Sequence, residues 1–124
     1  MLKKASKTKA SAAPGTRVAI VASRYNARYV NSMLRTAKAE LAKAKVAAEV
    51  VRVPGAFEMP AVASALARRL TNPIDAILCL GVILRGKTAH AESIGQAVSS
   101  ALAQLQVEHS LPVIHEVLLL ENMQ

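Results

Sequence analysis

The chain has few aromatic residues and a single cysteine. Its 124 residues include no tryptophan, two tyrosines and one phenylalanine, although 52% are hydrophobic. A core without large rings must be built from closely packed alanine, valine, leucine and isoleucine. Cys79 has no cysteine partner in the chain, which excludes a disulfide-stapled mini-protein and predicts a reducing, cytoplasmic location.

Acidic residues are missing from the first 17 positions, which supply +5 of the net charge of +8. The remaining residues are only mildly basic, so nucleic acid is not the expected partner. We interpret residues 1–16 as a flexible basic tail, because they have no hydrophobic period, and residues 17–124 as a single α/β domain. No apolar run reaches about 18 residues, so no membrane partner is expected.

Several common motifs are also absent. A mononucleotide-binding loop needs GxxxxGK[ST] after the first strand, where this chain has Ser23-Arg24-Tyr25-Asn26. No GxGxxG dinucleotide fingerprint occurs. The three histidines are far apart and the cysteine is alone, so no metal site is expected.

Strand-like and helix-like patterns alternate along the chain. Strands are predicted at 17–22, 48–53, 76–83 and within 111–120, each a short apolar run. Between them, three helices are predicted from apolar stripes, the second with Pro60 in its first turn and its end at Asn72-Pro73. The stripes are Val30, Met33, Leu34, Ala37 and Leu41; Met59, Val62, Ala63 and Leu66; and Ile94, Ala97, Val98, Ala101, Leu102 and Leu105. This alternation predicts a three-layer, flavodoxin-like sandwich with a four-stranded parallel sheet.

Only a few polar residues follow the fourth predicted strand, so the final helix of such a fold is expected to be missing. Leu118, Leu119 and Leu120 would then leave an apolar face or edge open. A neighbouring subunit would cover them, or the chain is a truncated version of a longer one. Oligomerisation is favoured in both cases.

Ligands of open parallel sheets bind beyond the carboxyl ends of the strands. The loop after the third strand contains Arg85, Lys87 and Thr88 and leads into a helix near His90. Free backbone N–H groups at a helix start, with a hydroxyl and cations nearby, can bind phosphate, and a histidine can transfer protons at neutral pH. The alternative is that Thr88 only caps the helix and the cations are solvated.

The loops after the first two strands contain Tyr25 and Phe57, which could stack on a planar ring, and Glu58, which could accept hydrogen bonds from it. Alternatively, Phe57 anchors the core and Glu58 is a favourable first-turn acid. His115, inside a strand, is more typical of a satisfied interior histidine, and Cys79 is expected to be inert.

In combination, these loops resemble the 6,7-dimethyl-8-ribityllumazine synthase family (the riboflavin synthase beta chain family). The resemblance runs from about Arg17 to Asn122. Its motifs are Arg24-Tyr25-Asn26, the segment 53–60 (VPGAFEMP), the segment 80–90 (LGVILRGKTAH) and, more weakly, Pro112-Val113-Ile114.

The resemblance implies a cofactor-free condensation of 5-amino-6-(D-ribitylamino)uracil with 3,4-dihydroxy-2-butanone 4-phosphate in riboflavin biosynthesis. It implies that His90 transfers protons and that Lys87 and Thr88 hold the phosphate. The pyrimidine and its ribityl chain would contact Tyr25, Ala56, Phe57, Glu58, Val82, Ile83 and Leu84. His115 would reach a neighbour's site in a pentamer or in a shell of twelve pentamers.

The chain departs from the family pattern in several places. Ala91-Glu92 stands where the family has an aromatic residue and an acid, His115-Glu116 replaces a Phe-Gly pair, and Leu119-Leu120 replaces threonines. The family also continues for another helix or two, with an arginine that holds the substrate phosphate. A catalytically impaired shell-forming or binding protein on the same fold is therefore the alternative interpretation.

Overall fold

The computed structural model describes residues 15–86 and 89–121, so most of the predicted basic tail lies outside the described residues. Its four strands form one parallel sheet in the order β2-β1-β3-β4. They are β1 (Arg17–Ser23), β2 (Ala47–Val53), β3 (Ala76–Arg85) and β4 (Val113–Glu121). The connections contain α1 (Ala27–Lys43), the single turn η1 (Ala56–Glu58), α2 (Met59–Ala67) and α3 (His90–His109).

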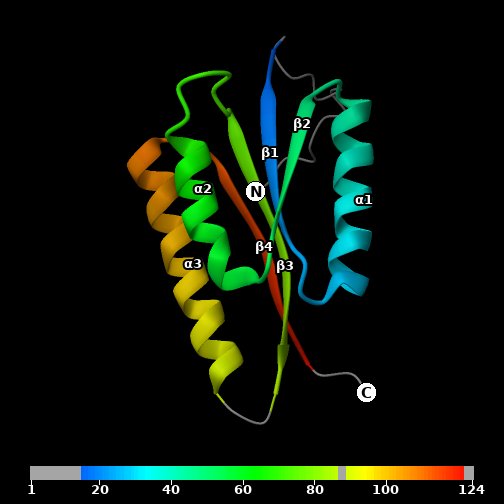
Figure 1. Ribbon diagram of the computed structural model, residues 1–124, viewed down its shortest axis with the longest axis vertical. Coiled ribbons are helices and arrows are strands. Elements are labelled where there is room, and N and C mark those ends of the chain that lie inside the picture. The colour runs from blue at the N-terminus through cyan, green and yellow to red at the C-terminus, as the bar shows by residue number, and fades with distance from the viewer. Residues whose placement is uncertain (1–14, 87–88, 122–124) are drawn as a thin grey trace, which may run out of the picture.

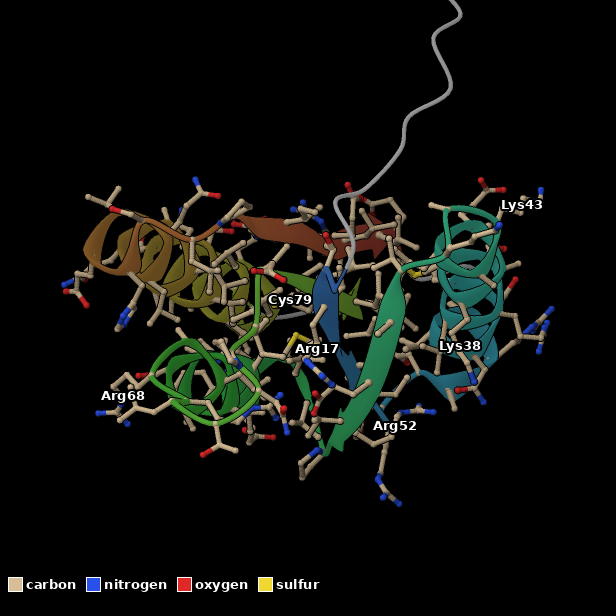
Figure 2. The ribbon with its side chains drawn as sticks, turned by 90° about the horizontal axis from the view of Figure 1, so that it is seen from above. Arg17, Lys38, Lys43, Arg52, Arg68 and Cys79 are labelled. Carbon is tan, nitrogen blue, oxygen red and sulfur yellow. The ribbon has the colours of Figure 1, made fainter. Side chains whose placement is uncertain are left out.

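Helices cover both faces of the sheet. Helix α1 lies on one face and α2 and α3 lie on the other (Figure 1), and the view along the strands shows the three layers (Figure 2). The predicted three-layer sandwich with a four-stranded parallel sheet is therefore confirmed. All strands run in the same direction, so their carboxyl ends meet at the edge that is lowest in Figure 1.

Two apolar clusters hold the layers together. The larger one fills the space between the sheet and helices α2 and α3, around the fully buried Met59 and Ile77. The smaller one joins the sheet to α1 through Ile20 and Val30. Most residues of the predicted helix stripes belong to these clusters, but Ala101 belongs to neither and Ala97 is exposed. It precedes the buried Val98 by one residue, about 100° around the helix, and points away from the sheet.

Part of the α1 face of the sheet has no helix over it. A groove of about 680 Å³ lies there, with α1 as its wall and strands β3 and β4 as its floor. Leu118 and Leu120 line it, and they are 38% and 36% exposed. Leu119 is also 36% exposed. Within the described residues, Leu118 and Leu120 thus form an open apolar surface on the α1 face, as the sequence predicts, whereas Leu119 points to the opposite face, beside α3.

An ion-pair cluster lies at the opposite edge of the sheet from the strands' carboxyl ends. Arg69 donates two hydrogen bonds to the Glu49 carboxylate, at 2.9 and 2.6 Å, and Arg17 lies 3.9 Å from it. Arg69 also donates to the carbonyl of Asn72. These bonds hold the segment after α2 in a non-helical form, so the prediction that this helix extends to Asn72-Pro73 is wrong, and α2 ends at Ala67.

The cluster alters the acidity of its members. The hydrogen bond from Arg69, aided by the charges of Arg69 and Arg17, lowers the pKa of Glu49 below its usual value. The same hydrogen bond raises the pKa of Arg69. Because a carboxyl pKa that is lower in the folded state stabilises the fold above the unfolded pKa, this contribution is lost as the pH falls through the folded value.

Two further features concern membrane spans and the distribution of positive charge. No helix among the described residues is long and apolar enough to cross a bilayer. The labelled cations are also scattered, with Lys38 and Lys43 on α1 and Arg68 on the far side of α2 (Figure 2).

We predict that replacing Glu49 by Gln destabilises the fold at neutral pH but not in acid. Urea unfolding of both proteins between pH 7 and pH 3 would measure this difference. The gap should close as the pH falls, because the protonated Glu49 of the unchanged chain no longer pairs with Arg69. Glu40→Gln, which removes the exposed partner of Lys43, is the control. A gap that stayed constant with pH would contradict the assignment.

Candidate active site

Backbone hydrogen bonds join the loops that follow β1 and β2. The N–H of Arg24 donates to the Val53 carbonyl at 2.7 Å, and the N–H of Tyr25 donates to the Pro54 carbonyl at 2.9 Å. The Ser23 hydroxyl also donates to the Tyr25 carbonyl. The two loops therefore leave the sheet side by side, and Tyr25 is held next to the start of the segment that contains Phe57.

A cleft of about 470 Å³ lies at the carboxyl ends of the strands, and we call it the rim cleft. It brings together eight of the residues that the sequence singles out, from the segments after β1 and β2, from the end of β3 and from the start of α3. These are Tyr25, Ala56, Phe57, Glu58, Val82, Ile83, Leu84 and His90. Its other lining residues, which the sequence analysis did not propose as site residues, are Asn26, Gly55, Gly86, Ala91 and Ile94.

Both aromatic residues of the rim cleft are exposed. The exposed fraction is 74% for Tyr25 and 63% for Phe57. The alternative in which Phe57 anchors the core is therefore wrong. Exposed rings at the mouth of a cleft cost hydration free energy that a stacked planar ligand would recover.

Glu58 has a structural role in addition to its place in the cleft. Its Oε1 accepts a hydrogen bond of 2.9 Å from the N–H of Gly55, and its own N–H donates to the Gly55 carbonyl at 3.3 Å, so Glu58 closes the turn of η1 on Gly55. Helix α2 follows at once, with Pro60 in its first turn as predicted. The interpretation of Glu58 as a favourable helix-start acid is thus supported, and the same carboxylate lines the rim cleft.

Asn26 is a lining residue whose role the sequence analysis missed. Its backbone is left-handed, with φ 58° and ψ 43°, which asparagine tolerates better than most residues. Its side-chain Nδ2 donates a hydrogen bond of 2.6 Å to the carbonyl of Val82. The signal available in the sequence was the asparagine at the predicted strand-to-helix turn. This bond fixes the turn that presents Tyr25 against the end of β3.

Gly81 allows the start of α2 to approach β3 closely. A Cβ atom at this position would lie 2.9 Å from the Met59 Cε and 3.4 Å from the Val117 Cγ1. Met59 is fully buried in the apolar cluster between the sheet and α2. The absence of a side chain at Gly81 therefore leaves room for the tip of Met59 against β3.

The loop after β3 agrees only partly with the predicted anion site. Helix α3 begins at His90, and Lys87 and Thr88 lie outside the described residues. Arg85 was considered as a phosphate ligand. Its guanidinium instead pairs with Glu92 in the first turn of α3 and with Glu121 at the end of β4. The alternative in which Arg85 is only solvated therefore does not describe this side chain, which pairs with two carboxylates.

His115 does not line the rim cleft of its own chain. It lies on the exposed part of β4, where its Nε2 is 2.7 Å from the Ser99 hydroxyl. Its Nδ1 accepts a hydrogen bond of 3.1 Å from the N–H of Val117. In the neutral ring this leaves the proton on Nε2, which donates to Ser99. The pair therefore has the wrong tautomer for His115 to activate Ser99 as a nucleophile.

Metal ligands and the thiol are two further kinds of reactive group to consider among the described residues. No cluster of three or more potential metal ligands occurs in residues 15–86 and 89–121. Burial raises the pKa of the Cys79 thiol to about 12, which keeps it protonated and unreactive. Figure 2 shows Cys79 between the sheet and the helices that cover it.

Comparisons with known proteins agree with this geometry. A sequence model of the 6,7-dimethyl-8-ribityllumazine synthase family matches residues 15–124. Proteins of this name from Pediococcus pentosaceus and Stenotrophomonas maltophilia K279a are 37% and 38% identical over 111 residues, covering 87% of this chain and 70% of each relative. A third, from Xanthomonas oryzae pv. oryzae, is 35% identical over 114 residues, covering 90% of this chain and 73% of the relative. The chain belongs to the 6,7-dimethyl-8-ribityllumazine synthase family.

Membership of the lumazine synthase family makes the chain a transferase-type enzyme of riboflavin synthesis and supports substrate binding and oligomeric assembly. Within this family, the departure at Ala91 lies inside the cleft. Ala91 is 7% exposed and lines the rim cleft directly after His90. The small side chain leaves space beside the histidine where the resemblance implies an aromatic ring.

We predict that substitutions of Asn26 separate its two roles. Asn26→Gly keeps the left-handed backbone but loses the bond to Val82, at a cost of about 0.5–1.5 kcal/mol in the free energy of unfolding. Asn26→Ala also loses the bond but, unlike glycine, keeps a Cβ at positive φ, so it should be less stable than Asn26→Gly by about 1–2 kcal/mol. Urea unfolding measures both. Equal stability of the two variants would show that the backbone conformation is not a constraint.

Proposed function

We propose that this chain condenses 5-amino-6-(D-ribitylamino)uracil with 3,4-dihydroxy-2-butanone 4-phosphate to 6,7-dimethyl-8-ribityllumazine, releasing phosphate and water. The observation that supports this most directly is the rim cleft. It combines two exposed aromatic rings, a carboxylate and a histidine at the carboxyl edge of the sheet, in a chain of the lumazine synthase family.

The proposed binding of the pyrimidine uses the loops after β1, β2 and β3. Tyr25 stacks on the flat ring from the mouth of the cleft. Phe57 and Glu58, with Ala56, hold the ring and the ribityl chain from one side. The end of β3 holds them from the other side, through Val82, Ile83 and Leu84.

His90 is the proposed proton-transfer residue. The 5-amino group attacks the ketone and an imine forms with loss of one water. Phosphate is then eliminated, and the second amine closes the ring on the remaining carbonyl with loss of a second water. These steps move protons but no electrons to or from a cofactor. Much of the acceleration comes from holding two reactants together, and proton transfer by a histidine adds to it. The phosphate is assigned to Lys87 and Thr88 by the resemblance, at positions outside the described residues.

The proposed assembly is a homo-oligomer, a pentamer or a shell of twelve pentamers, with active sites shared between subunits. The open apolar surface of Leu118 and Leu120 beside α1 supports a subunit contact. The exposed His115 on β4 is proposed to reach a neighbour's rim cleft. A cytoplasmic location is proposed because the lone thiol of Cys79 suits a reducing compartment.

The activity is tested by incubating the purified chain with both substrates and following lumazine fluorescence. Product should form faster than in a protein-free reaction. No acceleration would contradict the enzymatic function and would support the alternative of a shell-forming or binding protein.

We predict that His90→Ala lowers kcat by about 10- to 100-fold. The loss should be at or below the smallest contributions typical of general acid–base catalysis, because the variant still holds the two substrates together. His109→Ala is the control, since His109 is the last residue of α3 at the opposite end of the helix. Sedimentation should show an unchanged assembly. Disassembly together with loss of activity would show that His90 is structural.

We predict that light scattering finds a mass near five or sixty times the chain mass of 13.1 kDa. Leu118→Asp should reduce this mass, because a charge in the open apolar surface opposes its burial. Lys38→Asp, on the outer side of α1, is the control. A monomer at all concentrations would contradict the shared-site proposal.

A further inference from the structure

Arg85 holds three elements together at the carboxyl edge of the sheet. Its Nη1 donates to Oε1 of Glu92 in the first turn of α3. Its Nε lies 3.2 Å from Oε1 of Glu121. Glu121 is the residue of β4 that pairs with Arg85 in the sheet register, so this second contact joins two neighbouring strand ends.

The contact between Arg85 and Glu92 spans the base of a loop. Arg85 is the last residue of β3, and Glu92 is the third residue of α3. Gly86, His90 and Ala91, which lie between them in the sequence, line the rim cleft. The ion pair therefore closes a short ring of chain that contains His90, and it restricts how far the start of α3 can move from the end of β3.

This ion pair contributes little to overall stability. The side chains of Arg85 and Glu92 are 38% and 50% exposed, and ion pairs of such exposure have small effects on folding. The larger apolar cluster between the sheet and α3 holds the body of the helix in place without it. Any consequence of the pair is local, because Glu92 lies in the first turn of α3, two residues after His90.

We propose that Arg85 and Glu92 are positioning residues, whose ion pair holds His90 at the productive place in the rim cleft. The inference rests on the proposed function, in which His90 transfers protons. Displacing a catalytic group by about 1 Å can cost about 100-fold in rate, so a contact of small energy can have a large kinetic effect.

A double-mutant cycle in kcat tests the proposal. Glu92→Gln and Arg85→Gln should each lower kcat by about 5- to 10-fold, and the double variant should be no slower than either, because both remove the same contact. The KM for the pyrimidine should change by less than about twofold, since Tyr25 and Phe57 are untouched. Independent, multiplying effects would contradict a shared role.

Two matched variants separate position from charge. Glu121→Gln removes a carboxylate from the same guanidinium but does not open the loop, so its kcat should stay within about twofold of the unchanged chain. Arg85→Lys keeps the charge but loses the planar fork, so it should recover part of the rate lost in Arg85→Gln. A loss of kcat in Glu121→Gln as large as in Glu92→Gln would show that only the local charge matters.

The imidazole resonance of His90 in a ¹H–¹³C spectrum gives a readout that does not depend on activity. It is assigned by its disappearance in His90→Gln. It should shift in Glu92→Gln and stay in place in Glu121→Gln. An unchanged resonance in Glu92→Gln would overturn the proposal, even if the unchanged chain makes no lumazine. A shifted resonance in an inactive chain would support the positioning role while refuting the proposed function.

Discussion

Strand β1 pairs with β2 on one side and with β3 on the other, and this double pairing determines where the cleft-lining loops begin. Ser23 is in register with Val53, and the pairing continues beyond the strands through the bonds of Arg24 and Tyr25. On the other side, Asn26 reaches the carbonyl of Val82. Because these contacts are made by backbone or by one short side chain, the loops have little freedom to separate.

The same contacts explain why the rings of Tyr25 and Phe57 stay exposed. Each ring follows a strand end whose backbone groups already have hydrogen-bond partners. Before Tyr25, the carbonyls of Ala22 and Ser23 accept hydrogen bonds from the Arg52 guanidinium. Before Phe57, the N–H of Gly55 donates to the Glu58 carboxylate. The backbone does not need the aromatic side chains for its stability. They are therefore available for a ligand.

Much of the fold could be predicted from the sequence because hydrophobic periodicity is a local signal. The apolar runs placed four strands with errors of only one or two residues at most ends, and the stripe around Val30 placed α1 against the sheet. The end of α2 could not be predicted in this way, because it depends on Arg69 reaching Glu49 on another strand. Ala97 was wrongly predicted to face the core, because an alanine at the border between the buried and exposed faces of a helix is compatible with both.

The candidate site was predictable to the extent that it lies at strand ends. The rule that ligands bind beyond the carboxyl ends of parallel strands selected Tyr25, Phe57 and His90 without knowledge of their contacts. It could not show that Arg85 is already paired, since Glu121 is distant in the sequence and adjacent only through the β3–β4 register. It also could not show that His115 lies outside the cleft of its own chain.

The most direct test of the central claim is a crystal structure of the chain with a pyrimidine substrate analogue that has a non-nucleophilic group in place of the 5-amino group. The account predicts that the flat ring lies against Tyr25 in the rim cleft, with the ribityl chain beside Phe57 and Glu58 and the blocked position toward His90. A ring bound elsewhere, or a ligand that contacts the aromatic residues while His90 faces away, would contradict it.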